Sequence, residues 1–174
     1  LEKTEKIAHF QEKCYFAHGR TISFSDGSGK GKYPMGLTCC LTDLYRDICF
    51  PDPVYARGFT GDRCWNWNEL YTGWRWTKQY LEDVENGIVE APKPLAGAGV
   101  EFLPDAEWCI LRGEHNTAVV AKGGNNDEPH NHNDVGSFFY LVDGEALLDD
   151  LGSGEYTKKY FSNQRYEIFC TRGL

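Results

Sequence analysis

The sequence has no apolar run near the roughly 18–20 residues that a membrane-spanning helix needs. Basic residues are few: 18 Lys and Arg stand against 26 Asp and Glu, giving a formal net charge of −8. This balance argues against a general nucleic-acid binder, whose affinity comes largely from Lys and Arg at phosphates. An anionic substrate stays open, because it needs only a local basic pocket. No Cys-x-x-Cys pair occurs, so a structural zinc ribbon or finger is not indicated.

The composition of the chain is that of a globular protein: 41% of its residues are hydrophobic, and 5 Trp, 10 Tyr and 10 Phe supply large side chains to bury. Its 7 cysteines are odd in number and irregularly spaced, and Cys39 and Cys40 lie in an apolar stretch. We interpret them as buried, reduced thiols rather than a disulfide framework, which favours a reducing compartment. The chain begins without Met at Leu1, in what reads as the middle of a helix. We therefore interpret it as a piece of a larger protein, and export remains open.

The hydrophobic period changes along the chain. Helical spacing dominates before residue 85, and strand alternation follows a Pro- and Gly-containing linker at 85–99. We predict helices at Glu5–Phe16, Leu37–Phe50 and Arg63–Val84, the last whole or broken near Gly73, and strands at Trp108–Arg112, Thr117–Lys122, Ser137–Val142 and Glu145–Asp150. This order indicates an α+β protein, with a helical part and linker at 1–95 and an antiparallel sheet part at 96–174.

A dense polar stretch at 123–134 separates two of the predicted strands. It contains His130 and His132, and a His-x-His pair in extended backbone directs both imidazoles to one face, where they can share a metal or a substrate. Asn131, Asn133 and Asp134 offer acceptors that fix imidazole tautomers. A solvated hairpin loop that happens to contain histidines explains the same residues. A cupin-like metal-binding barrel also matches at the two histidines, but this chain has Gly136 or Ser137 where the metal-binding Glu should stand.

Residues 102–156 carry a more extensive pattern in several ordered blocks. The blocks are Asp105–Arg112, Lys122-Gly123-Gly124, His130–Phe138 and Leu147–Gly152 with Tyr156. Asn163 and Arg165 follow further along the chain. In this order they resemble the heparinase II/III-like polysaccharide lyases. The segment Tyr15–Leu37, which contains the Ser23–Gly27 loop, is also similar to the region just ahead of that family's sheet domain.

The resemblance implies the end of a helical (α/α) toroid followed by the start of an antiparallel β-sandwich, both incomplete here, with the active site in the cleft between them. It implies β-elimination at a uronic acid of an acidic polysaccharide or oligosaccharide. The compartment is undecided between periplasm or cell envelope and cytoplasm, and a homodimer remains open. The alternative from another class is a carbohydrate-binding β domain without catalysis.

The resemblance also implies roles for individual residues. His130 matches the catalytic histidine, where it could neutralise the uronate carboxylate or act as base. His132 and Asp150 match ligands of a divalent metal, most simply zinc, whose third ligand would lie beyond Leu174. Tyr156 falls in a supporting position, and the family's acid/base tyrosine would lie before Leu1. This piece alone is expected to be inactive.

Three further expectations come from the residues themselves. Asn131 and Arg165 are candidate substrate ligands, since a guanidinium binds a carboxylate through two hydrogen bonds; a structural salt bridge is the alternative for Arg165. A straight two-residue hairpin at Asp143-Gly144 would pair Ser137 with Asp150 and leave His132 on the opposite face, unless the chain bends near Gly136. An aromatic cluster suits core packing better than a sugar-stacking platform. Its members are Trp65, Trp67, Tyr71, Trp74 and Trp76.

Overall fold

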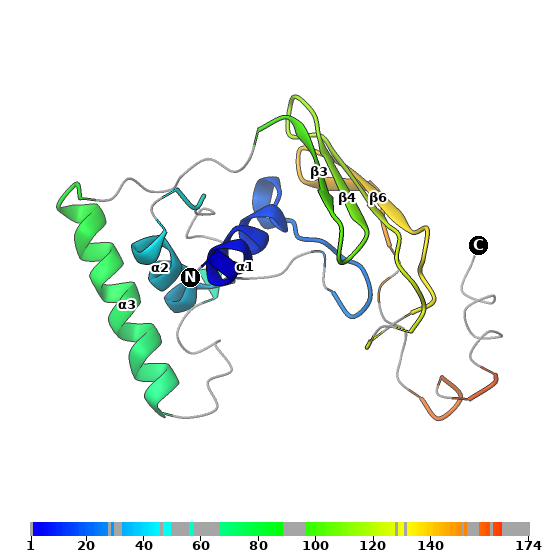
Figure 1. Ribbon diagram of the computed structural model, residues 1–174, viewed down its shortest axis with the longest axis horizontal. Coiled ribbons are helices and arrows are strands. Elements are labelled where there is room, and N and C mark those ends of the chain that lie inside the picture. The colour runs from blue at the N-terminus through cyan, green and yellow to red at the C-terminus, as the bar shows by residue number, and fades with distance from the viewer. Residues whose placement is uncertain are drawn as a thin grey trace.

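The computed structural model describes residues 2–27, 29, 33–45, 47–49, 56–57, 67–88, 97–127, 129–130, 132–150, 152, 157–160 and 162–164. Within these ranges the chain is an α+β protein with three α-helices and a five-stranded antiparallel sheet, which confirms the predicted class (Figure 1). The elements are α1 (Glu2–Lys13), the 3-10 turn η1 (Ala17–Gly19), β1 (Tyr33–Pro34), α2 (Met35–Leu44), β2 (Ala56–Arg57), α3 (Trp67–Glu85), β3 (Gly99–Leu103), β4 (Trp108–Arg112), β5 (Ala118–Lys122), β6 (Phe138–Val142) and β7 (Glu145–Leu148). None of the helices in this described part is long and apolar enough to cross a membrane.

Helix α1 links the other helices to the sheet. On one side the Gln11 amide donates a hydrogen bond of 2.8 Å to the Thr38 hydroxyl in α2. On the other side Lys13 pairs with Glu101 of β3, and Arg112 of β4 donates to the Lys13 carbonyl at 2.7 Å. In Figure 1 this helix accordingly lies between the α2–α3 pair and the sheet.

Helices α2 and α3 cross closely at two glycines. A Cβ on Gly36 would lie 2.5 Å from the Cα of Gly73, so only glycine at position 36 fits this approach. Gly73 does not break the helix, because α3 continues through it to Glu85. The helix predicted at Leu37–Phe50 is shorter than expected, since α2 ends at Leu44.

The sheet follows chain order, β3-β4-β5-β6-β7, with each strand antiparallel to the next. Four of its strands lie where the hydrophobic alternation predicts them. The fifth strand, β3, is not among the predicted strands: it begins at Gly99, where the predicted linker ends, and runs to Leu103 within the part predicted to form the sheet.

The predicted tight turn is confirmed, with Val142 opposite Glu145 and positive φ angles at Asp143 and Gly144. The straight pairing beyond it is wrong. A bulge follows, because Leu141 faces Ala146 whereas Tyr140 faces Leu148. One extra residue shifts the register by one and reverses the face to which later side chains point.

One face of the sheet is covered by the segment that follows α1. Phe16 and Phe24 from this segment pack into a core with Ile110, Val120 and Phe139, and all five are at most 4% exposed. The opposite face is apolar and open, and its exposed side chains are Val100, Phe102, Leu111, Phe138 and Leu148. Phe16 and Phe24 therefore belong to the core of the sheet, although the sequence places them far before it.

Candidate functional site

The polar stretch between β5 and β6 folds back on the end of β5. Lys122 donates its backbone N–H to Ser137 and accepts from Gly136, at 2.9 and 2.8 Å, so the two ends of the stretch are held together. Inside it His130 and Asn133 have φ angles of 59° and 56°, in the left-handed region that non-glycine residues rarely adopt. The backbone is thus bent sharply on both sides of His132.

A buried ion pair fixes this bent loop to the Ser23–Gly27 loop. The Lys122 ammonium lies 2.7 Å from an Asp134 carboxylate oxygen, and their side chains are 1% and 7% exposed. The other oxygen accepts the backbone N–H of Ser25 at 3.2 Å, and Lys122 also reaches the Ser25 hydroxyl at 3.2 Å. Burial alone would raise the pKa of Asp134, but the hydrogen bond and charge of Lys122, with the N–H of Ser25, hold that pKa below its usual value.

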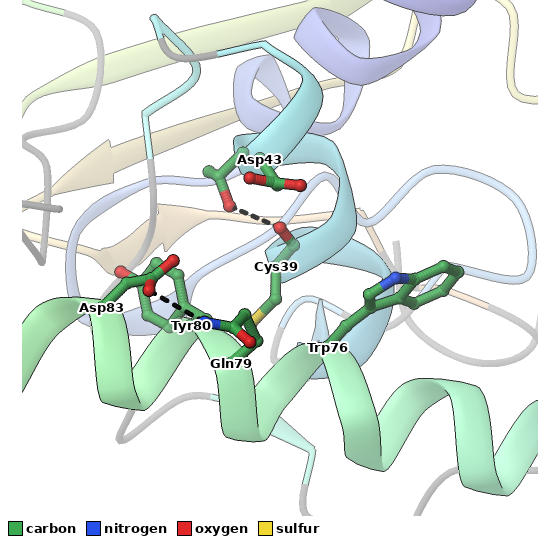
Figure 2. A pocket seen from close by; sticks show the side chains of 7 residues that line it. Cys39, Asp43, Trp76, Gln79, Tyr80 and Asp83 are labelled. Atoms are coloured by element: carbon green, nitrogen blue, oxygen red, sulfur yellow. Dashed lines mark hydrogen bonds between the residues drawn. The ribbon is translucent and has the colours of Figure 1, made fainter. Parts of the chain in front are cut away.

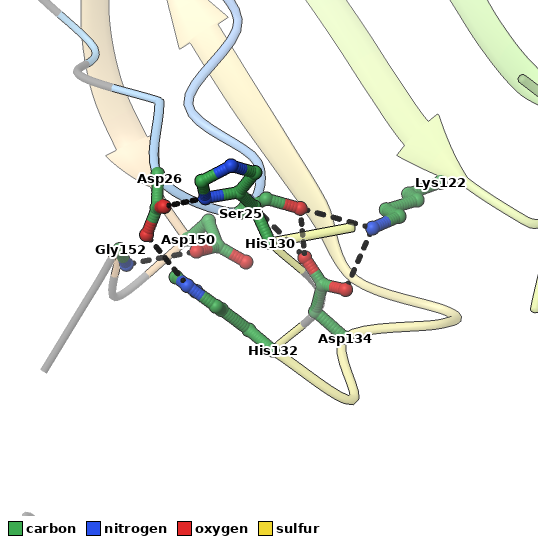
Figure 3. Close-up of polar contacts among 8 residues, drawn as sticks. All are labelled: Ser25, Asp26, Lys122, His130, His132, Asp134, Asp150 and Gly152. Atoms are coloured by element: carbon green, nitrogen blue, oxygen red, sulfur yellow. Dashed lines mark hydrogen bonds and ion pairs between the residues drawn. The ribbon is translucent and has the colours of Figure 1, made fainter. Parts of the chain in front are cut away.

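This contact places Asp26 between the two histidines (Figure 3). One oxygen of its carboxylate lies 2.5 Å from Nδ1 of His130, and the other lies 3.0 Å from Nε2 of His132. An ionised carboxylate only accepts hydrogen bonds, so each of these ring nitrogens carries a proton and donates it. The histidines predicted to share a site are brought together, and the group that joins them is Asp26.

The two imidazoles differ in exposure. The His130 side chain is 74% exposed, whereas that of His132 is 6% exposed. In the described part of the chain the buried Nδ1 of His132 has no hydrogen-bond partner. His130 can therefore meet a ligand from solvent, while His132 presents only its Nε2, towards Asp26.

Asp149 and Asp150, which follow β7, accept hydrogen bonds from different parts of the chain. Asp149 accepts from Arg20 at 2.5 Å and from the Ser23 hydroxyl at 3.0 Å, which fastens the end of β7 to the same N-terminal segment. Asp150 accepts the backbone N–H of Gly152 at 2.8 Å. Straight pairing of β6 with β7 would have left Asp150 on the face opposite His132. The bulge in β7 shifts the register by one residue, so this expected separation no longer applies.

Among the described residues no group of three or more His, Cys, Asp or Glu side chains could hold a metal ion. His132 directs Nε2 to Asp26, and Asp150 binds Gly152. Binding of a divalent metal by His132 and Asp150, with a third ligand beyond Leu174, stays a prediction.

The other predicted site residues have separate outcomes. Asp134 contacts Lys122 and Ser25 rather than an imidazole, so its contribution is to hold the loop. Asn133 lies exposed in that loop. Asn131, Tyr156 and Arg165 lie outside the described residues.

Sequence reasoning did not assign Asp26, Lys122, Arg20 or Asp149 to the site. The available signal was Lys122 itself, a charged residue at the end of an otherwise apolar strand, which is unusual unless it is paired. Asp26 had no comparable local signal, because its partners are 104 and 106 residues further along the chain.

No protein-family model matches this chain, and no curated protein was found to match it.

A separate hollow, open to solvent, lies between α2 and α3 (Figure 2). Its lining includes the buried thiol of Cys39, the rings of Trp76 and Tyr80, and the carboxylates of Asp43 and Asp83. Burial raises the pKa of the Cys39 thiol from 9.0 to about 12, so this sulfur is protonated and unreactive near neutral pH. The hollow contains none of the groups that the histidine site uses.

Cys39 should accordingly resist alkylation. A rise in thiol pKa from 9.0 to about 12 lowers the thiolate fraction about a thousandfold at pH 8. We expect iodoacetamide, followed by peptide mass spectrometry, to label Cys39 far more slowly in the folded chain than in denaturant, and faster as pH rises. Equal labelling rates in both states would contradict this expectation.

The aromatic cluster on α3 is partly at the surface. Tyr71 and Trp74 are 61% and 46% exposed, with ring centroids 6.1 Å apart. Core packing is therefore wrong for these two rings, and a sugar-stacking role stays a prediction. Trp65 and the side chain of Trp67 lie outside the described residues.

Proposed function

We propose that this chain is part of a polysaccharide lyase that cleaves uronic-acid-containing glycans by β-elimination. The observation that carries the proposal is the exposed imidazole of His130, oriented by the Asp26 carboxylate, which also binds the buried His132. An orienting carboxylate behind a solvent-facing histidine is the arrangement that acid/base catalysis uses.

The resemblance of the His130–Phe138 and Leu147–Gly152 blocks to heparinase II/III-like lyases supplies the substrate class. β-Elimination requires that the uronate carboxylate be neutralised, that the C5 proton be removed and that the leaving glycosidic oxygen be protonated. His130 can take part in the first or second of these steps. The resemblance assigns the remaining acid/base work to a tyrosine outside this chain.

The supporting contacts explain why the site would keep its shape in water. Lys122 and Asp134 hold the histidine loop onto Ser25, and Arg20 and Asp149 hold the end of β7 onto the segment leading to it. Both attachments have a buried cation, with Lys122 and Arg20 side chains 1% and 7% exposed. Preorganisation of this kind limits the reorientation needed when a substrate arrives.

A carbohydrate-binding domain without catalysis is the second candidate, and the exposed Tyr71–Trp74 pair favours it. Sugar rings stack on exposed aromatic faces, and binding of this kind needs no histidine. Retained glycan binding without formation of an unsaturated uronate would support this candidate over the lyase.

The full natural protein should convert uronate-containing oligosaccharides into products with a 4,5-unsaturated uronate, detected by their ultraviolet absorbance. His130→Ala should lower turnover by about 10²–10⁴-fold, because a positioned proton-transfer group contributes about that much. His115→Ala is the matched control, since His115 is exposed in the β4–β5 connection. Turnover unaffected by His130→Ala would remove this histidine from the mechanism. Metal analysis of the same protein tests the predicted zinc separately.

A further inference from the structure

We infer that helix α3 carries a separate binding site for acidic sugars, formed by the rings of Tyr71 and Trp74 and the ammonium group of Lys78. The class of glycan comes from the proposed function, on which this site therefore rests, and the site adds a second place on the molecule where that glycan binds. The observation that carries it is a cation held beside two exposed aromatic rings.

The three side chains lie on one face of α3. Residues 71, 74 and 78 are three and four positions apart, which places them together on the surface of a helix. The helix packs on α2 through another side, where Thr77 and Tyr80 are only 4% and 5% exposed and both lie near α2. The aromatic face is therefore not the one that α3 uses to pack on α2.

The rings and the cation are close enough for one sugar to contact them together. The ring centroids of Tyr71 and Trp74 lie 6.1 Å apart at an interplanar angle of 37°, and these residues are 61% and 46% exposed. Nζ of Lys78 lies 5.8 Å from the centroid of the Trp74 ring, within the distance of a cation–π contact. The indole thereby holds the ammonium group beside the stacking surface, and the Lys78 side chain remains 58% exposed.

This combination matches the two parts of a uronic acid. The C–H groups on one face of a pyranose ring pack on the exposed aromatic faces of Tyr71 and Trp74. The carboxylate on C5 of the same sugar accepts a charge-assisted hydrogen bond from the ammonium group of Lys78. A neutral sugar uses the rings alone, so Lys78 is the group that makes the site prefer an acidic sugar.

Glu82 competes with the sugar for this ammonium group. Its carboxylate lies 3.4 Å from Nζ of Lys78, one helical turn away, and its side chain is 48% exposed. An exposed ion pair of this kind contributes little to stability, so a uronate carboxylate can replace Glu82 at Lys78 at small cost. Removal of the Glu82 charge should therefore strengthen the binding of acidic sugars.

The site lies apart from the histidine loop. In Figure 1 helix α1 lies between α3 and the sheet, and the β5–β6 connection of that sheet carries His130. Binding at α3 therefore holds the glycan and takes no part in cleaving it.

The test follows binding at Trp74 itself. It uses the full natural protein with His130→Ala, so that the glycan is not cleaved, labelled with 5-fluorotryptophan. The ¹⁹F signal of Trp74, assigned with Trp74→Phe, is recorded during titration with hexasaccharides of alginate and of hyaluronan, two uronate-containing glycans. The same hexasaccharides with their carboxyl groups reduced to alcohols serve as neutral ligands.

Three variants and a matched control test the role of the charge. Lys78→Met removes the cation and keeps most of the side chain, Lys78→Arg keeps the cation, and Glu82→Gln removes its competitor. Lys6→Met is the control, because Lys6 forms an exposed pair with Glu2 at the same four-residue spacing on α1.

We expect at least one acidic hexasaccharide to shift the Trp74 signal saturably, and its reduced counterpart to bind about three- to fivefold more weakly. Lys78→Met should weaken binding of the acidic hexasaccharide to about the same extent and leave binding of the reduced one unchanged. Lys78→Arg should bind like wild type, Glu82→Gln should bind more tightly, and Lys6→Met should have no effect.

A Trp74 signal that neither acidic hexasaccharide shifts would remove the site. Equal affinity for acidic and reduced hexasaccharides, or full affinity in Lys78→Met, would show that Lys78 does not select for acidic sugars and would overturn the inference. The comparison of acidic with reduced ligands needs no change at Lys78. Absence of an unsaturated product from wild type refutes the proposed function instead, whereas the Trp74 signal reports binding without turnover, so the two failures are distinguishable.

Discussion

Replacing Lys122 with methionine should lower the free energy of unfolding by about 3–5 kcal/mol. The Lys122 side chain is 1% exposed and neutralises Asp134, itself 7% exposed, at 2.7 Å. Methionine fills similar space but leaves the Asp134 carboxylate buried without its cation. The loss should be measured by urea unfolding of the variant against wild type.

Two comparisons make this expectation specific. Lys6→Met removes the exposed Lys6–Glu2 pair of α1, whose side chains are 75% and 83% exposed, and should cost only about 0.2–0.5 kcal/mol. The double variant Lys122→Met with Asp134→Leu should recover part of the loss, because it removes the unpaired charge. A cost at Lys122 no larger than that at Lys6 would show that the pair does not hold the two loops together.

Replacing Phe24 with alanine should be similarly damaging, at about 3–5 kcal/mol. Phe24 is 4% exposed, and its ring centroid lies 5.3 Å from that of Phe139 and 5.5 Å from that of Trp108. The truncation leaves a cavity beneath the chain that leads to Ser25 and Asp26. Urea unfolding measures the stability, and the turnover expected under the proposed function should fall along with it.

The control for Phe24 is a phenylalanine on the other face of the same sheet. Phe102 is 59% exposed, so Phe102→Ala should change stability by no more than about 0.5 kcal/mol. Equal losses from both variants would mean that the two faces of the sheet are buried alike.

Much of the fold could be predicted from the sequence because its signals are local. Strands β4 to β7 follow from period-two alternation, and the hairpin follows from Asp143-Gly144. Strand β3 could not be found this way: Gly99–Leu103 adjoins a Pro- and Gly-rich linker, and its extended form depends on pairing with β4. Gly73 gave an ambiguous signal, because an isolated glycine can either interrupt a helix or be tolerated within it, and the sequence around it does not decide between the two.

The site was predictable only in part, for a related reason. Two histidines in one short polar stretch mark a candidate site locally, and the structure does bring His130 and His132 to one group. The sequence could not identify Asp26 as that group, since Asp26 contacts the two histidines only because two distant loops lie together in the fold. The bulge at Leu147 was equally hidden, because it breaks an otherwise regular strand pattern.

The N-terminal cover of the sheet has a consequence for how the chain folds. Contacts such as Arg20 to Asp149 and Ser25 to Asp134 join residues separated by 129 and 109 positions. A topology rich in such distant contacts has a high contact order, and closing the long loop costs entropy before its contacts form. During synthesis, residues 14–27 leave the ribosome well before strands β3 to β7 exist. Phe16 and Phe24 therefore remain exposed to water until the strands of the sheet have been synthesised and can bury them.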